Sequence, residues 1–418
     1  MTANPKIISH FPKGVVAVPP SKSQAHRVII CALLSRGESF IENISFSQDI
    51  LATLNAAAVL GASWSKTGEN AVKIDGIGGI PQVQSGCIIP CGQSATTLRF
   101  LMPVAAALGL HVTFAGEGRL MLRPIDQYER CFAENGATIE RVPDGISVKG
   151  KLCSGMYSLD GNVSSQFVSG LLLALPLLAG NSEITVHGQL ESSAYVTMTA
   201  DACLKFSVYS QTDGCGKYSI RGGQTYLPTA FTIEGDYSQA AYFLAAGALG
   251  ADVACAGLSP DSLQPDKAIL TILRRMGATV THIADGAIKA YAKELYATDV
   301  DVSQTPDIAP PISALMCFAR GKSRITGATR LRLKESDRLR SITGALRSLG
   351  ADIIEEGDTL VITGRPSISG GLTDAYGDHR IAMMAALASL KCETPVTLTG
   401  WETIDKSYPN FWQDWEQQ

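Results

Sequence analysis

Six apolar segments recur along the chain at intervals of roughly 70 residues, and each begins with polar residues. They start near Lys22, Ser94, Ser164, Tyr237, Asp307 and Asp378. Each run is apolar on nearly all sides, which predicts a helix buried inside its domain rather than one lying on a surface. Six such intervals account for nearly the whole chain, so the pattern indicates a repeated architecture.

Two other kinds of segment recur between these runs. Short β-like pieces such as SEITVHG, GISVKG, AVKIDG and DTLVITG are bounded by Gly, Asp or Asn. Amphipathic segments such as DQYERCFAENGAT, DKAILTILRRMGAT and LRSITGALRSLGAD end in Gly-Ala before a strand, which is a helix C-cap signal. The repeating unit is therefore predicted to be a buried helix, strands, an amphipathic helix and further strands.

The fold class predicted from this pattern is α/β, with two similar domains of three units each, buried helices inside and sheets outside. The N-terminal domain is predicted to span residues 20–234 and to hold repeats one to three. The C-terminal domain is predicted to combine residues 1–19 with residues 235–418 and to hold repeats four to six. The two crossovers are placed at Pro19-Pro20 and near Glu234-Gly235-Asp236.

Composition and charge exclude several classes of protein. With 45% hydrophobic and 18% charged residues and a net charge of -4, the chain is globular, and neither nucleic acid nor a membrane surface is expected as a partner. Ten scattered cysteines lack zinc-ligand spacing, and no phosphate-binding loop or dinucleotide fingerprint occurs. No apolar run follows the first lysine. We therefore expect a cytoplasmic, monomeric protein with no metal and no cofactor.

The starts of the predicted buried helices combine hydroxyl groups with cations. Helix N-termini attract phosphates and carboxylates, although Ser94 alone fits a capping role equally well. Capping does not explain Arg27, Arg99 and Arg380, each about one turn inside an apolar run, where an unpaired charge costs several kcal/mol. These arginines need anions from the protein or from a ligand, and Arg99 also fits a structural role.

Further cations lie in GEGRLMLRPID, LRLKESDRLR and IDKSYPNF. The second stretch also fits a solvated helix start with an Asp337–Arg340 ion pair. Asp307, at the start of an apolar run, fits either an N-cap or a general base. Many cations with a few carboxylates and no cofactor motif favour acid–base chemistry on polyanionic substrates.

The motifs PPSKSQAHR, SATTLRFLMP, LRPID, DGNVSSQF, LKESDRL, GDHRIAM and DKSYPNF, in this order, resemble those of the 3-phosphoshikimate 1-carboxyvinyltransferase (EPSP synthase) family. The resemblance covers nearly the whole chain and implies the enolpyruvyl transferase fold, two domains of three βαβαββ units. It implies transfer of the enolpyruvyl group of phosphoenolpyruvate to the 5-hydroxyl of shikimate 3-phosphate, with release of phosphate, in chorismate and aromatic amino acid biosynthesis.

The resemblance also implies roles for individual residues. The catalytic residues would be Lys22, Asp307 and Glu335. Shikimate 3-phosphate would be bound by Lys22, Ser23, Arg27, Ser164, Ser165, Gln166, Ser192, Tyr195, Asp307, Arg330 and Lys334. Phosphoenolpyruvate would be bound by Lys22, Ala95, Arg123, Gln166, Arg338, His379, Arg380 and Lys406. Asp307 would take the proton of the 5-hydroxyl, Glu335 would protonate the enolpyruvyl methylene with Lys22 sharing proton transfer, and domain closure would require substrate.

Two positions depart from the family pattern. Ala95 stands in GQSAT where familiar members have Gly against phosphoenolpyruvate, so a methyl group removes space there. The family's inhibitor glyphosate is longer than phosphoenolpyruvate, and we expect tolerance to it. Arg330 replaces an Asn that touches the shikimate phosphate.

Two other interpretations remain open at the level of sequence. UDP-N-acetylglucosamine 1-carboxyvinyltransferase shares the fold and the donor but uses a loop Cys, and AGEGRLMLRP contains none. A two-domain anion-binding protein without catalysis would keep the arginines but would not need Asp307 and Glu335 beside them.

Overall fold

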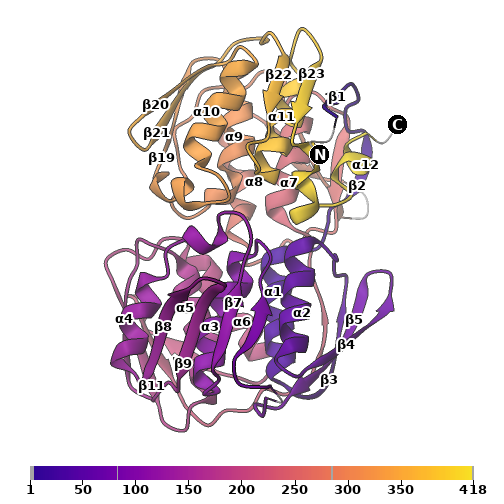
Figure 1. Ribbon diagram of the computed structural model, residues 1–418. Helices are drawn as coiled ribbons and strands as arrows, with labels where there is room; N and C mark the ends of the chain where they lie inside the picture. Colours follow the sequence, from indigo (N-terminus) through magenta and orange to yellow (C-terminus); the bar gives the residue numbers. More distant parts are fainter. Residues whose placement is uncertain (1–3, 82, 284–285, 417–418) are drawn as a thin grey trace. The chain divides into compact units, whose positions relative to one another are not determined.

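The computed structural model describes residues 4–81, 83–283 and 286–416 (Figure 1). The chain divides into an N-terminal unit, Pro20–Ile233, and a C-terminal unit that combines Met1–Pro19 with Glu234–Gln418. The boundary predicted from the sequence, between residues 234 and 235, lies one residue further along the chain. That each unit is a domain able to fold by itself stays a prediction.

The N-terminal unit contains three repeats, each with one buried and one outer helix and a four-stranded sheet. The first holds α1 Lys22–Leu34, β3 Arg36–Glu42, α2 Gln48–Val59, β4 Ser63–Gly68, β5 Ala71–Ile77 and β14 Ala230–Thr232. The second holds β6 Cys87–Pro90, α3 Ala95–Ala107, β7 Val112–Ala115, α4 Asp126–Glu134, β8 Ala137–Val142 and β9 Gly145–Gly150. The third holds β10 Met156–Asp160, α5 Ser165–Ala174, β11 Ser182–His187, α6 Ser193–Lys205, β12 Ser210–Thr212 and β13 Lys217–Ile220.

The C-terminal unit repeats the plan. Its first repeat holds β2 Gly14–Ala17, α7 Tyr237–Ala248, β15 Val253–Ala256, α8 Ile269–Arg275, β16 Thr279–His282 and β17 Ile288–Tyr291. The second holds β18 Val300–Asp301, α9 Ala309–Met316, β19 Lys322–Thr326, α10 Arg338–Ser348, β20 Asp352–Glu356 and β21 Thr359–Thr363. The third holds β22 Gly371–Asp374, α11 His379–Ser389, β23 Val396–Thr399, η7 Trp401–Lys406, α12 Phe411–Trp415 and β1 Lys6–Ile8.

Strand order is the same in five of the six repeats, and the last repeat has a three-stranded sheet, β22-β23-β1. In the sheet β6-β7-β9-β8 the first two strands are parallel, with Cys87 opposite Val112, and the remaining pairs are antiparallel. A buried helix connects the parallel pair, as such crossovers require. The structure is therefore α/β with βαβαββ units, which confirms the predicted fold class.

Strands from distant parts of the chain take the first-strand position in two sheets, and β1 adds the third strand beside β23 in the sheet of the last repeat. β2 lies parallel to β15, with Gly14 opposite Val253, so residues before Pro19 belong to the C-terminal unit. β14, at the end of the N-terminal unit, lies parallel to β3, with Ala230 opposite Phe40. β2 and β14 each serve as the first strand of a repeat whose own stretch of chain contains no such strand.

The buried helices form the core of each unit, as their apolar patterns predict. Ile29 in α1 and Leu101 in α3 are fully buried, as are Leu315 in α9 and Met384 in α11. Strands such as β11 alternate buried and more exposed residues, so one face of each sheet packs on the helices. This arrangement brings helix starts together, because each buried helix follows the carboxyl end of a first strand.

Hydrogen bonds show that the helix starts adjoin in the N-terminal unit. His26 of α1 bonds to Thr53 of α2 at 2.7 Å, and Thr53 bonds to Thr97 of α3 at 2.6 Å. The Thr97 hydroxyl donates to Ser94, the cap of α3. A chain of one imidazole and three hydroxyl groups therefore links the N-terminal halves of α1, α2 and α3.

Gly170 allows α3 and α5 to approach closely. A methyl group at this position would lie 2.5 Å from the carbonyl oxygen of Arg99 and would collide with the Tyr128 hydroxyl, which itself donates to that carbonyl. We expect Gly170→Ala to lower the free energy of unfolding by about 1–3 kcal/mol, because the core cannot expand locally. Urea denaturation measures this loss.

Gly68→Ala is the matched control, because its added methyl would lie 3.6 Å from its nearest neighbour, the Cβ of Ala71. We expect this change to alter stability by less than about 0.5 kcal/mol. Equal stability of the two variants would contradict the packing argument.

Candidate active site

Lys22 opens α1 and forms an ion pair with Asp49 in the first turn of α2, at 2.8 Å between Nζ and Oδ2. Ser21 caps α1 by accepting from the backbone N–H of Gln24 at 3.4 Å. The sequence did not single out Asp49. An acidic residue at a helix start is common, because the helix dipole favours negative charge there, so its position alone did not indicate a bond to Lys22.

Arg27 is a buried cation that has no carboxylate partner among the described residues. It is 3% exposed and donates to the Thr199 hydroxyl at 2.8 Å and to the carbonyl oxygens of Ser23 and Tyr195 at 2.6 and 2.9 Å. Burial lowers the pKa of this guanidinium to about 10. That Arg27 needs an anion stays a prediction, and its hydrogen-bond partners above are neutral oxygens.

Arg99 has a structural role, which was one of the two alternatives that the sequence allowed. Its guanidinium donates to the Gln166 side-chain oxygen and to the Pro124 carbonyl, both at 2.9 Å. The Gln166 amide nitrogen in turn donates to the Thr96 hydroxyl at 2.9 Å. Arg99 and Thr96 thus orient Gln166, one of the predicted binding residues.

The serines at the next two helix starts act as caps. Ser94 accepts from the backbone N–H of Thr97 at 3.2 Å, and Ser164 accepts from that of Gln166 at 3.3 Å. The capping interpretation of Ser94 is thereby confirmed. Ala95, the first residue of α3, is 7% exposed, so its methyl group is enclosed.

The remaining predicted residues of the N-terminal unit lie around helix ends. Ser165 and Ser192 are buried, and Ser192 has a φ of 57° just before α6, a conformation that is uncommon for a non-glycine residue. The Tyr195 ring centroid lies 5.8 Å from the Arg27 guanidinium carbon. Arg123 follows the short helix Leu120–Leu122.

Asp307 in the C-terminal unit is surrounded by three cations. Its carboxylate lies 2.8 Å from Arg338 and 3.3 Å from both Lys334 and Arg380. Burial alone would raise the pKa of Asp307, but Arg380, Lys334 and Arg338 lower it well below its ordinary value. The alternative that Asp307 is an N-cap is wrong, because it lies within the turn Pro306–Ile308 and Ile308 precedes α9.

Arg338 connects Asp307 to two further carboxylates. It is 1% exposed and forms ion pairs of 2.7 Å with both Glu335 and Asp378. Asp378 also caps α11 by accepting from the backbone N–H of Arg380 at 3.0 Å. Sequence reasoning had read Asp378 only as a helix start, and nothing local revealed its bond to a residue 40 positions earlier.

Lys334, Arg330, His379 and Lys406 complete the predicted set in this unit. Burial lowers the pKa of Lys334 to about 8, although Asp307 opposes the shift. Arg330 donates to the Ser303 carbonyl at 2.5 Å. His379 and Lys406 are buried at the start of α11 and the end of η7.

Arg332 anchors the segment that carries Lys334, Glu335 and Arg338. Its guanidinium lies 2.8 Å from Asp358 and 2.7 Å from Glu355, both in or beside the β20–β21 hairpin, and 3.2 Å from Asp337, the cap of α10. The Asp337–Arg340 pair also forms, at 3.6 Å, but the segment is tied down and is not merely a solvated helix start.

No helix within residues 4–81, 83–283 and 286–416 combines the length and apolarity needed to cross a membrane. In the same residues no group of three or more His, Cys, Asp or Glu is placed to hold a metal ion.

We expect Arg332→Ala to loosen the segment 329–338, because three carboxylates lose their common cation. Backbone amides of this segment should exchange with deuterium about tenfold faster, since local opening becomes easier. The control is Arg324→Ala, because Arg324 pairs with Glu356 of the same hairpin at 3.3 Å but has no bond to Asp337. Equal exchange in both variants would argue against the anchoring role.

Comparisons with known proteins agree over almost the entire chain. The family model for EPSP synthase (3-phosphoshikimate 1-carboxyvinyltransferase) matches residues 9–415. Proteins named 3-phosphoshikimate 1-carboxyvinyltransferase from Clostridium kluyveri and Clostridium acetobutylicum are 43% and 40% identical to the chain. The alignments cover 96% and 97% of this chain and 94% and 95% of theirs.

The fold comparison gives the same family. The structure of EPSP synthase from Acinetobacter baumannii matches with a TM-score of 0.80 and 27% identity, and the match covers 99% of this chain and 96% of that one. Sequence and fold thus lead to one conclusion, that this chain belongs to the EPSP synthase family of enzymes.

Proposed function

We propose that this enzyme transfers the enolpyruvyl group of phosphoenolpyruvate to the 5-hydroxyl of shikimate 3-phosphate and releases phosphate. One observation carries the proposal. Two carboxylates suited to proton transfer, Asp307 and Glu335, share the buried guanidinium of Arg338 and adjoin the cations Lys334 and Arg380. A site for proton transfer on anionic substrates needs this combination.

The proposal assigns the predicted residues to the two substrates. Shikimate 3-phosphate is held by Lys22, Ser23, Arg27, Ser164, Ser165, Gln166, Ser192, Tyr195, Asp307, Arg330 and Lys334. Phosphoenolpyruvate is held by Lys22, Ala95, Arg123, Gln166, Arg338, His379, Arg380 and Lys406. Arg27 supports the first assignment most directly, because an anion would compensate its buried charge. Arg330, where familiar members have Asn, takes the phosphate contact with its longer side chain.

Asp307 is the proposed base for the 5-hydroxyl proton. Without substrate the neighbouring cations lower its pKa and make it a weak base. The phosphate and carboxylate groups of bound substrates partly neutralise the charges of Arg380 and Lys334. These cations then lower the pKa of Asp307 less, so its basicity rises when substrates bind. The proton acceptor is thereby activated by the anions it acts upon.

Glu335 supplies the opposite proton transfer. It protonates the methylene carbon of phosphoenolpyruvate, which makes the neighbouring carbon electrophilic, and the 5-oxygen adds there as Asp307 takes its proton. The tetrahedral adduct then loses phosphate, which carries away the proton held by Asp307, while a methyl proton returns to Glu335, with Lys22 sharing proton transfer. The reaction balances with no cofactor, and the enzyme acts as a cytoplasmic monomer in the pathway to chorismate.

Phosphate release with defined acceptors tests the proposal. Phosphoenolpyruvate with shikimate 3-phosphate should yield phosphate, and Asp307→Asn should lower kcat at least about 100-fold, the usual range for removing a general base. Phosphate release from phosphoenolpyruvate with UDP-N-acetylglucosamine as the acceptor, and none with shikimate 3-phosphate, would favour the UDP-N-acetylglucosamine 1-carboxyvinyltransferase activity. Tight binding of both substrates without any phosphate release would favour a non-catalytic anion-binding protein.

We expect activity to fall as the pH rises through about 8, because Lys334 loses the charge that binds substrate anions. The group must be protonated, so kcat/KM should be level below its pKa and decline roughly tenfold per pH unit above it. Lys334→Arg should move this decline to higher pH whatever its effect on the absolute rate. An unchanged profile in that variant would exclude Lys334 as its source.

We expect Ala95→Gly to make the enzyme more sensitive to glyphosate, because it removes an enclosed methyl group from the first turn of α3. The inhibition constant should fall at least about tenfold, while KM for the shorter phosphoenolpyruvate changes less. Thr96→Ser, a matched loss of one methyl at the next position, is the control. Equal inhibition of natural enzyme and Ala95→Gly would refute glyphosate tolerance through Ala95.

A further inference from the structure

A second cation-rich hollow lies in the C-terminal unit, away from the helix starts that carry the candidate active site. It is a cavity of about 500 Å³ beside the carboxyl ends of α7, α9 and α11. Buried apolar residues, including Leu249, Leu295 and Ala319, form its inner wall with the half-buried Phe318. The opposite ends of these same helices hold Arg380 and Asp307.

Four cations line the hollow against one carboxylate. They are Lys293, Arg320, Arg365 and Lys391, and the carboxylate is Glu294. Arg320 lies 3.8 Å from Glu294, and Arg365 lies 3.3 Å from Asp352, so both are in exposed pairs that contribute little.

Lys293 and Lys391 are exposed, and neither has a carboxylate within ion-pair distance in the described part of the chain. An excess of positive charge therefore gathers here, although the chain as a whole carries a net charge of -4.

Helix dipoles do not account for this gathering. Cations do stabilise helix carboxyl ends, but the N-terminal unit offers a direct comparison. Its hollow at the ends of α1, α3 and α5 has a volume of about 250 Å³ and is lined by a single charged residue, Lys151. The repeated architecture thus exists without a cation cluster, and the cluster is a property of the C-terminal unit.

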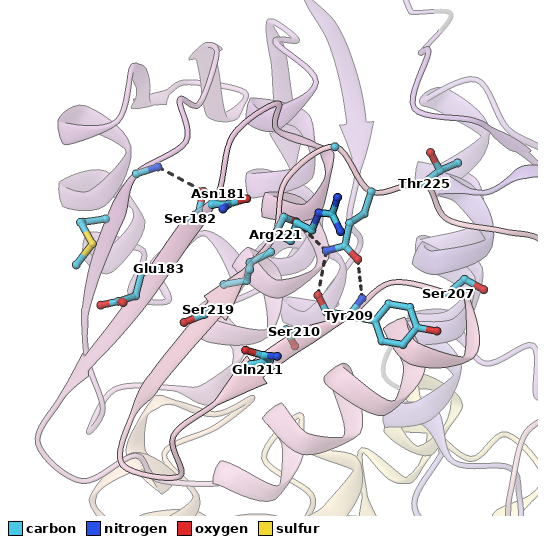
Figure 2. A pocket seen from close by; sticks show the side chains of 15 residues that line it. Asn181, Ser182, Glu183, Ser207, Tyr209, Ser210, Gln211, Ser219, Arg221 and Thr225 are labelled. Atoms are coloured by element: carbon cyan, nitrogen blue, oxygen red, sulfur yellow. Dashed lines mark hydrogen bonds between the residues drawn. The ribbon is translucent and has the colours of Figure 1, made fainter.

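A different hollow in the N-terminal unit is electrically balanced. It has a volume of about 870 Å³ and is lined by Arg221 and Glu183 among hydroxyl and amide groups (Figure 2). Gln224 donates to the carbonyl of Tyr209 at 2.9 Å and accepts from its backbone N–H at 2.8 Å, so this amide is already engaged. Charge distinguishes the hollow of the C-terminal unit from this one.

We propose that the hollow lined by Lys293 and Lys391 binds a small organic polyanion with an apolar or aromatic body. The body packs on Leu249 and Phe318, and two or more carboxylate or phosphate groups meet the exposed cations at the rim. The helix carbonyl groups disfavour negative charge deeper inside, which keeps the anionic groups at the mouth. The site is independent of the proposed reaction.

Isothermal titration with benzene-1,3,5-tricarboxylate tests the site. The double variant Lys293→Ala/Lys391→Ala should lose one equivalent of binding or bind it about tenfold more weakly, because two exposed charges are removed. Both side chains are exposed, so folding should be retained, and phosphate release without the probe should be unchanged. Tricarboxylate that binds at the candidate active site should bind the natural and variant proteins equally. The difference in binding between the two proteins therefore measures binding in this hollow.

Lys151→Ala is the matched control, because it removes the cation from the corresponding hollow of the N-terminal unit. It should bind the tricarboxylate as the natural protein does. Unchanged binding in the double variant, or no binding by the natural protein, would overturn the proposal. Equal binding of the neutral benzene-1,3,5-trimethanol at this site would also overturn it, since recognition would then not depend on charge.

Discussion

The candidate active site of the C-terminal unit depends on the burial of one cation, Arg338. A guanidinium removed from water is strongly destabilising unless carboxylates surround it, and Asp307, Glu335 and Asp378 do so within 2.8 Å. These three carboxylates would in turn repel one another without the guanidinium. The nearby cations thus lower the pKa values of Asp307 and Asp378, and the guanidinium fixes the positions of all three carboxylates.

The repeated fold explains why such groups meet. Within each unit, every repeat directs the start of its buried helix to the same end of that unit. The first turn of each helix needs partners for its free N–H groups. Ser94, Ser164 and Asp378 provide these partners as caps. Arg27 takes no part in this capping, and its guanidinium donates instead to the oxygens of Thr199, Ser23 and Tyr195. The repeated fold therefore places the caps and the buried cations at the same helix starts.

The cations around Asp307 also set its proton affinity. Asp307 is held at low basicity by Lys334 and Arg380 while these cations have no substrate anion to bind. Under the proposed function, an anion that binds them would compete with Asp307 and return its basicity, which would couple substrate binding to proton transfer. The cations that line the hollow of the C-terminal unit have only one carboxylate among the lining residues, Glu294, which lies 3.8 Å from Arg320.

The sequence by itself determined the six buried helices, the amphipathic helices, the α/β class and the family, because periodicity and motifs are local properties of the chain. That Arg27 needs an anion stays a prediction from the sequence. Only the tertiary structure decided that β2 pairs with β15, that Lys22 meets Asp49, and that Arg332 is tied to the β20–β21 hairpin. These partners are separated by more than 20 residues in sequence, and packing of the repeats, rather than any local pattern, brings them within bonding distance.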